Sequence, residues 1–96
     1  MNQDLIERAL EGDEAAAQAL HSTHYPAVFR LAYLLTQNPD DADDATQEAF
    51  IYAFTHLDKY NPNRSPFGSW LKVIVTSRCR DLQRKQRITP ISLQAL

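Results

Sequence analysis

The side chains that most often perform catalysis or bind metals are few in this sequence. It holds three histidines and one cysteine among 96 residues. His21 and His24 are one helical turn apart and could share a metal ion, but the sequence places no third ligand beside them. Cys79 has no histidine positioned to activate it, and a single cysteine excludes an intramolecular disulfide. We therefore predict a protein that is not an enzyme and that requires no cofactor and no metal.

Acidic and basic residues are concentrated in opposite parts of the chain. Residues 1–58 hold eleven acidic and two basic side chains, a net charge of −9, whereas residues 59–96 hold eight basic and one acidic, a net charge of +7. Favourable interaction with helix dipoles explains charges at helix ends but not Lys72, Arg78 and Arg80 in the middle of a segment. This asymmetry predicts two partners, one basic and one polyanionic.

The elements that must position these charges are helices. Prolines interrupt the apolar periodicity, and no segment shows the sustained alternation of a strand. We expect a short first helix ended by Gly12, a second capped by Asp13 and reaching about residue 37, a third over about 41–60 and a fourth from Pro66 to about residue 87. Pro26 should kink or split the second helix. The predicted fold is all-α, a compact bundle of three main helices plus a short N-terminal helix, with one domain over 1–87 and the start of a linker over 88–96.

Helical spacing also predicts which side chains face inward. On the first two helices these are Leu5, Ile6, Ala9, Leu10, Leu20, Val28, Leu31, Leu34 and Leu35. On the third they are Ala42, Ala45, Thr46, Ala49, Phe50, Ala53 and Leu57, and on the fourth Phe67, Trp70, Leu71, Ile74 and Leu82.

The outward side of the third helix has the composition of a docking surface. It presents Asp40, Asp44, Gln47, Glu48, Ile51 and Thr55. An exposed isoleucine surrounded by carboxylates is typical of a helix that binds a basic helical partner. The alternative is an ordinary solvated face with one surface isoleucine.

The fourth helix and the loop before it carry groups suited to nucleic acid. The far side of the helix holds Lys72, Thr76, Cys79, Arg80, Gln83 and Arg87, which could neutralise phosphates and reach base edges. The loop offers an aromatic ring, two amides and an arginine for an unstacked base, in Tyr60, Asn61, Asn63, Arg64 and Ser65. An ordinary Asn-Pro turn is the alternative for the loop. Arg78 falls on the inward side, where it must extend to solvent, pair with an acid or leave a gap.

These motifs resemble a known family. Residues 41–50, Asp-Ala-Asp-Asp-Ala-Thr-Gln-Glu-Ala-Phe, are similar to the acidic polymerase-binding motif of bacterial sigma factors of the extracytoplasmic-function group. Leu57-Asp58-Lys59-Tyr60, Phe67-Gly68-Ser69-Trp70-Leu71, the basic helix and Asp81 resemble the rest of that family's second conserved region, so the likeness covers residues 4 to about 87.

The resemblance implies specific partners for each surface. Asp40, Asp44, Gln47, Glu48 and Ile51 would bind the clamp helices of the largest subunit of core RNA polymerase. The loop 60–65 would hold a base flipped from the non-template strand of the minus-ten promoter element, and the helix would contact that DNA through Lys72, Thr76, Ser77, Arg80, Gln83 and Arg84. The resemblance further implies an anti-sigma regulator and a helix-turn-helix domain after residue 96.

Two departures from the family's pattern bear on these expectations. Thr76-Ser77 replaces the usual Arg-Asn pair, which implies an altered promoter preference, and Arg78 replaces a usual leucine.

The alternative to a promoter-binding domain is a helical interaction module whose basic helix binds an acidic protein rather than DNA. The sequence start lacks the features of a signal peptide and no apolar run is long enough to span a bilayer, so we expect a cytoplasmic location without membrane contact.

Overall fold

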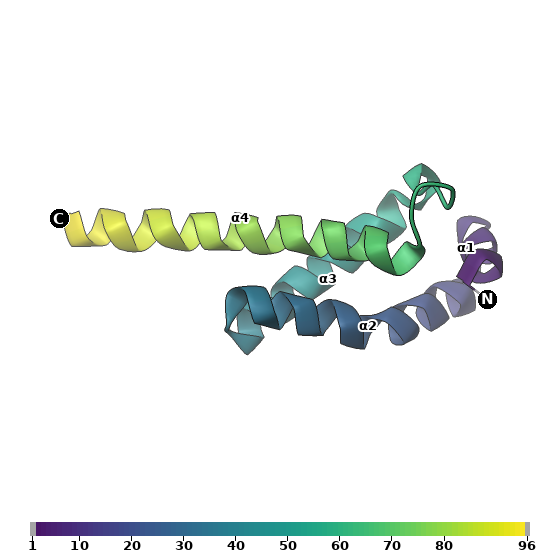
Figure 1. Cartoon of the computed structure of the whole chain (residues 1–96), viewed down its shortest axis with the longest axis horizontal. Helices are drawn as coiled ribbons and strands as arrows, with labels where there is room; N and C mark the ends of the chain where they lie inside the picture. Colours follow the sequence, from purple (N-terminus) through teal and green to yellow (C-terminus); the bar gives the residue numbers. More distant parts are fainter. Residues whose placement is uncertain (1, 96) are drawn as a thin grey trace.

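The computed structural model of the chain is a bundle of helices (Figure 1). It describes the backbone of residues 2–95 and the side chains of residues 3–85. In chain order the elements are α1 (Asn2–Leu10), α2 (Glu14–Thr36), α3 (Pro39–Thr55), a 3-10 turn η1 (Leu57–Lys59) and α4 (Phe67–Ala95). Within the described backbone there is no strand, so the all-α prediction is confirmed. Helices α2, α3 and α4 each pack on the other two, and α1 packs on α2.

The residues that α3 contributes to the shared interior of α2, α3 and α4 are mostly small. All seven residues predicted to face inward from the third helical segment are buried: Ala42, Ala45, Thr46, Ala49, Phe50, Ala53 and Leu57. Alanine at these positions lets the neighbouring helices approach α3 closely. Thr46 is buried without loss of a hydrogen bond, because its Oγ1 donates to the carbonyl of Ala42 at 2.7 Å. The opposite side of α3 is thereby fixed as a solvent-exposed face.

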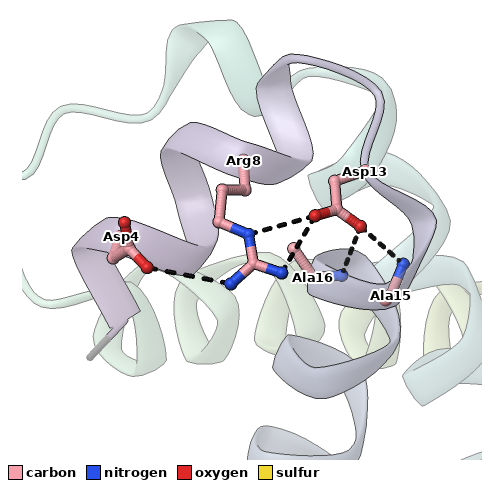
Figure 2. A network of polar contacts seen from close by, with 5 residues as sticks. All are labelled: Asp4, Arg8, Asp13, Ala15 and Ala16. Carbon is pink, nitrogen blue, oxygen red and sulfur yellow. Dashed lines mark hydrogen bonds and ion pairs between the residues drawn. The ribbon is translucent and has the colours of Figure 1, made fainter.

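The turn between α1 and α2 is held by a polar network around Asp13 (Figure 2). One carboxylate oxygen of Asp13 accepts hydrogen bonds from the amides of Ala15 and Ala16 at 3.0 and 3.2 Å, which confirms the predicted cap. The other oxygen accepts from Arg8 Nε at 3.0 Å, and Arg8 also lies 3.8 Å from Asp4. The backbone hydrogen bond from Ala16, followed by the bond from Arg8, lowers the pKa of Asp13 below its ordinary value.

Replacing Asp13 with alanine is expected to lower the thermal midpoint by roughly 5 °C, because two amides at the start of α2 lose their acceptor. Asp13→Asn keeps the acceptor for the two amides and loses only the ion pair and hydrogen bond with Arg8, so its midpoint should fall less. A carboxyl whose pKa is lowered on folding stabilises the protein above its unfolded pKa and loses that effect as the pH falls. The difference between wild type and Asp13→Ala should therefore shrink below about pH 4, as thermal melts followed by circular dichroism would show. Equal midpoints for all three proteins at pH 7 would contradict the capping role.

Several inward-facing predictions for α1 and α2 are wrong. Leu34 and Leu35 are 62% and 38% exposed, and Leu10 is 50% exposed. The buried side of α2 runs instead through Leu20, Val28 and Ala32. Ala32 is four residues after Val28 and lies directly above it on the helix, and its small side chain allows close packing that the larger leucines would prevent.

Helix limits also differ from expectation. α2 is one helix that contains Pro26, so the proline does not split it. α3 begins at Pro39 behind the cap residue Asn38 and ends at Thr55, five residues before the expected end, because the chain there turns so that Leu57 enters the interior. The backbone of α4 is helical to Ala95, beyond the expected end at about residue 87. The proposed domain limit at residue 87 remains a prediction.

Candidate protein-binding and nucleic-acid-binding surfaces

The outer face of α3 is exposed along its whole length. Its predicted residues, Asp40, Asp44, Gln47, Glu48, Ile51 and Thr55, are all solvent-exposed. Ile51 is 66% exposed, and the neighbouring Tyr52, which sequence reasoning did not include, is 38% exposed. Apolar side chains left in solvent among carboxylates are available to a partner without any change in the fold.

The acidic residues of α3 differ in what they contact. Asp43 accepts a hydrogen bond from the hydroxyl of Tyr25 on α2 at 2.9 Å, so it joins two helices. Burial, and then this hydrogen bond to Asp43, raise the pKa of Tyr25. Asp40, Asp44 and Glu48 lie on the outer face of α3 and are exposed to solvent.

The loop between η1 and α4 is a structured turn. Asn61 Oδ1 accepts from the amide of Asn63 at 2.9 Å, and the Asn61 carbonyl accepts from the amide of Arg64 at 3.0 Å. Tyr60 donates its hydroxyl to the carbonyl of Ser65 at 2.7 Å and closes the loop. Burial raises the pKa of Tyr60 above its ordinary value. The ordinary-turn alternative thus describes the backbone of the loop correctly.

The same loop also borders a hollow of about 480 Å³. The residues that line it come from η1, the loop and the first two turns of α4: Lys59, Tyr60, Asn61, Arg64, Ser65, Trp70 and Val73. Tyr60 stacks at a tilt on Trp70, with ring centroids 5.1 Å apart. Two cations, an amide and aromatic rings therefore surround a space large enough for a nucleobase. Asn63 is exposed but is not among the lining residues. Lys59 and Val73 were not among the predicted contact residues, and Trp70 was predicted to face inward rather than to stack on a base.

A second hollow, of about 380 Å³, follows on α4. It is lined by Lys72, Val73, Thr76, Ser77 and Arg80, four of which were predicted to contact nucleic acid. Val73 lines both hollows and is 69% exposed, so the two hollows adjoin at this side chain. Thr76 donates its hydroxyl to the carbonyl of Lys72 at 2.7 Å, which directs that hydroxyl toward the backbone.

Other predicted contact residues of α4 have different surroundings. Cys79 is buried at 1% exposure, so its placement on the outward side is wrong: α2 covers it, and its Sγ lies 4.0 Å from the carbonyl of Ala32. Burial raises the pKa of the Cys79 thiol, which opposes nucleophilic chemistry.

Gln83 donates from Nε2 to the carbonyl of Leu35 at 2.6 Å and ties α4 to the end of α2. Arg84 pairs with Asp81 at 3.7 Å, and the side chain of Arg87 lies outside the described residues.

Comparison with known proteins identifies the family. Residues 20–88 match the model of sigma-70 region 2, which is most of the chain. The chain belongs to the sigma-70 region 2 family. The resemblance to the extracytoplasmic-function group is confirmed by relatives that carry that name. The chain is 40% identical over 78 residues to the ECF RNA polymerase sigma factor SigE of Mycolicibacterium smegmatis, covering 78% of this chain and 30% of the relative.

Two further relatives of this sigma-70 region 2 chain match it over a similar share of its length. SigW of Bacillus subtilis, an ECF RNA polymerase sigma factor, is 32% identical over 85% of this chain and 43% of its own length. The RNA polymerase sigma factor CnrH of Cupriavidus metallidurans is 33% identical over 88% of this chain and 44% of its own length. The chain therefore spans less than half the length of these relatives.

The histidines of this sigma-70 region 2 chain pack as aromatic rings. His21 lies 4.5 Å from the ring centroid of Phe50, and His24 meets Phe67 edge-on at 5.2 Å. Burial, and then the charge of Lys72, lower the pKa of His24. In the part of the chain that the structure describes, no three histidine, cysteine or acidic side chains gather as a metal site would require. No helix among those residues is long and apolar enough to cross a membrane.

Proposed function

We propose that this chain is the part of an alternative sigma factor that binds core RNA polymerase and the minus-ten promoter element during transcription initiation. The polymerase contact is the outer face of α3, with Asp40, Asp44, Gln47, Glu48 and Ile51. The observation that carries this assignment is the 66% exposure of Ile51, because a large apolar side chain kept in solvent among acidic residues fits a docking anchor. An anti-sigma regulator would act by covering this face.

The nucleic-acid contact is the pair of adjoining hollows on the loop and α4. The non-template strand would run over them, with one unstacked base in the loop hollow near Tyr60, Asn61 and Arg64. Lys72 and Arg80 would neutralise phosphates along the second hollow. The contact is supported by three observations: cations line both spaces, aromatic rings adjoin the first, and Val73 connects them.

Promoter opening would follow from differential binding. Stacking a flipped base on an aromatic surface contributes roughly 1–3 kcal/mol, which is comparable to the cost of unpairing it. A site that holds single-stranded DNA and has no equivalent contact with duplex DNA shifts the equilibrium toward the open form. Binding energy suffices for this step, and no nucleotide hydrolysis is required.

The proposal is tested by measuring DNA binding in the complex of this chain with core RNA polymerase. Fluorescent oligonucleotide pools randomised at the minus-ten positions are offered as the non-template single strand and as duplex. The proposal expects the core-bound chain to prefer the single strand and this preference to weaken with rising salt. If the chain binds core polymerase but adds no single-strand affinity to it, the nucleic-acid half is wrong. The helical interaction module with an acidic protein partner would then be favoured.

A further inference from the structure

A third hollow lies between α3 and α4, beside the outer face of α3. It measures about 260 Å³ and is lined by Glu48 of α3 and by Arg78, Asp81, Leu82, Arg84 and Lys85 of α4. Three cations face two carboxylates here, so the charge of this α3–α4 groove is positive, whereas the adjacent face of α3 is acidic. The family resemblance assigns Glu48 to the polymerase contact and Arg84 to DNA, but it assigns no role to Arg78, Asp81, Leu82 or Lys85.

Arg78 is held at this groove by its neighbours. Its guanidinium carbon lies 5.4 Å from the centre of the Tyr52 ring, a cation–π distance, and its Nη1 lies 3.9 Å from Asp81 Oδ2. Among the described residues, its buried Nε has no hydrogen-bond partner. This arrangement resolves the sequence-based question about Arg78, because the arginine pairs with an acid and covers an aromatic ring.

The charged groups of the groove have unused capacity for an anion. Asp81 is shared by Arg78 and Arg84 at 3.9 and 3.7 Å, both longer than the 2.7–2.9 Å of a charge-assisted hydrogen bond. The Arg78 side chain is 32% exposed, so the part of its guanidinium that faces solvent could bind a partner's carboxylate, and Lys85 would add a second positive charge.

We infer that the α3–α4 groove binds an acidic side chain of the same helical partner that docks on α3. The inference rests on the proposed polymerase contact. Glu48 belongs to both surfaces, and Tyr52 lies between the exposed Ile51 and Arg78, so the two surfaces are continuous. The groove shares no lining residue with the two hollows proposed for DNA, which favours a protein ligand over a phosphate.

The consequence is a fixed orientation for the partner. A helix that lies over Ile51 must present basic residues to Asp44 and Glu48 and a carboxylate to Arg78 and Lys85. Opposite charges on neighbouring parts of one interface suppress shifted or reversed docking, since a reversed helix would place like charges together. Arg78 is thus a specificity-determining residue of the polymerase contact.

The test compares charge-removing variants in titrations of the fluorescently labelled 96-residue chain with core RNA polymerase. Arg78→Met retains an unbranched side chain that can cover Tyr52, and Lys85→Gln changes an exposed position. Arg30→Met, at an exposed arginine of α2, is the control for net charge. We expect about tenfold weaker binding for Arg78→Met and about threefold for Lys85→Gln, with no change for Arg30→Met. Affinity of the core-bound chain for the single-stranded oligonucleotide should be unaffected by all three.

The outcomes separate this inference from the proposed function. If Ile51→Asp abolishes polymerase binding but Arg78→Met and Lys85→Gln do not weaken it, the groove inference is overturned and the docking face remains. If both variants weaken oligonucleotide binding instead, the groove holds a phosphate and the inference is also overturned. If Ile51→Asp itself has no effect, the proposed polymerase contact fails and the inference with it. Should Arg78→Met fail to fold, Lys85→Gln decides between these results.

Discussion

Replacing Ile51 with aspartate is expected to weaken binding to core RNA polymerase by about a hundredfold or more, while the thermal midpoint changes by only about 2 °C. Loss of a central apolar anchor typically costs 2 kcal/mol or more of binding energy. The new carboxylate would add an uncompensated charge at the centre of the interface, beside Gln47 and Glu48. The fold loses little because Ile51 is 66% exposed in the free chain. Titration with labelled polymerase and a thermal melt measure the two effects on the same sample.

The matched control for this substitution is Leu34→Asp. Leu34 is 62% exposed near the end of α2. Leu34→Asp therefore also replaces an aliphatic side chain by a carboxylate at almost the same exposure, but on another helix. Binding to polymerase should be retained in this variant. Equal loss from both substitutions would show that added negative charge, and not the α3 face, weakens binding. A large drop in the midpoint of Ile51→Asp alone would mean that Ile51 supports the hydrophobic core.

The face of α3 could be predicted from sequence because alanine, threonine and phenylalanine recur there at helical spacing, which fixes which side is buried. The predicted start at about residue 41 is two residues late, because Asn38 caps the helix by accepting hydrogen bonds from the amides of Asp40 and Asp41. A shift of the start along the helix axis does not change which side faces inward. Once the inner side of a helix is known, its outer side follows without further information.

The burial predictions that failed concern side chains whose exposure depends on whether a neighbouring helix covers them. Leu34 and Leu35 have the spacing of inward residues, but the packing of α2 through Ala32 leaves them exposed. Cys79 was placed outward with the polar residues near it, whereas the interior is completed by Val75 and Cys79 against α2. Helical periodicity gives a side chain's direction but not the position of the helix that covers it.

The hollows were only partly predictable for a related reason. Their lining combines the loop with separate turns of α4, so Val73 acquires its place from the three-dimensional arrangement and not from any motif. Arg78 likewise acquires partners from α3 and its own helix. In the sequence, Val73 follows Lys72 and lies outside the inward-facing set of the fourth helix, and this position is the signal that could have indicated the junction of the two hollows.

Replacing Lys72 and Arg80 together with alanine is expected to weaken binding of the core-bound chain to single-stranded minus-ten DNA by about tenfold or more at 0.1 M salt. Both side chains line the hollow on α4 and would each neutralise one phosphate. For single strands, each contact contributes about 0.7 to the slope of log affinity against log salt. The slope should therefore fall by about 1.4 in the double variant. Arg30→Ala on α2 provides the control and should leave both quantities unchanged.

The salt slope is the sharper of these two measurements, because it counts released counterions and so reports phosphate contacts directly. A partly unfolded variant would lose affinity through a smaller active fraction, yet the remaining molecules would keep the original slope. Weaker binding with an unchanged slope would thus contradict a phosphate role for Lys72 and Arg80. An equal fall in slope for Arg30→Ala would indicate that the strand responds to overall charge, and the path along α4 would have to be abandoned.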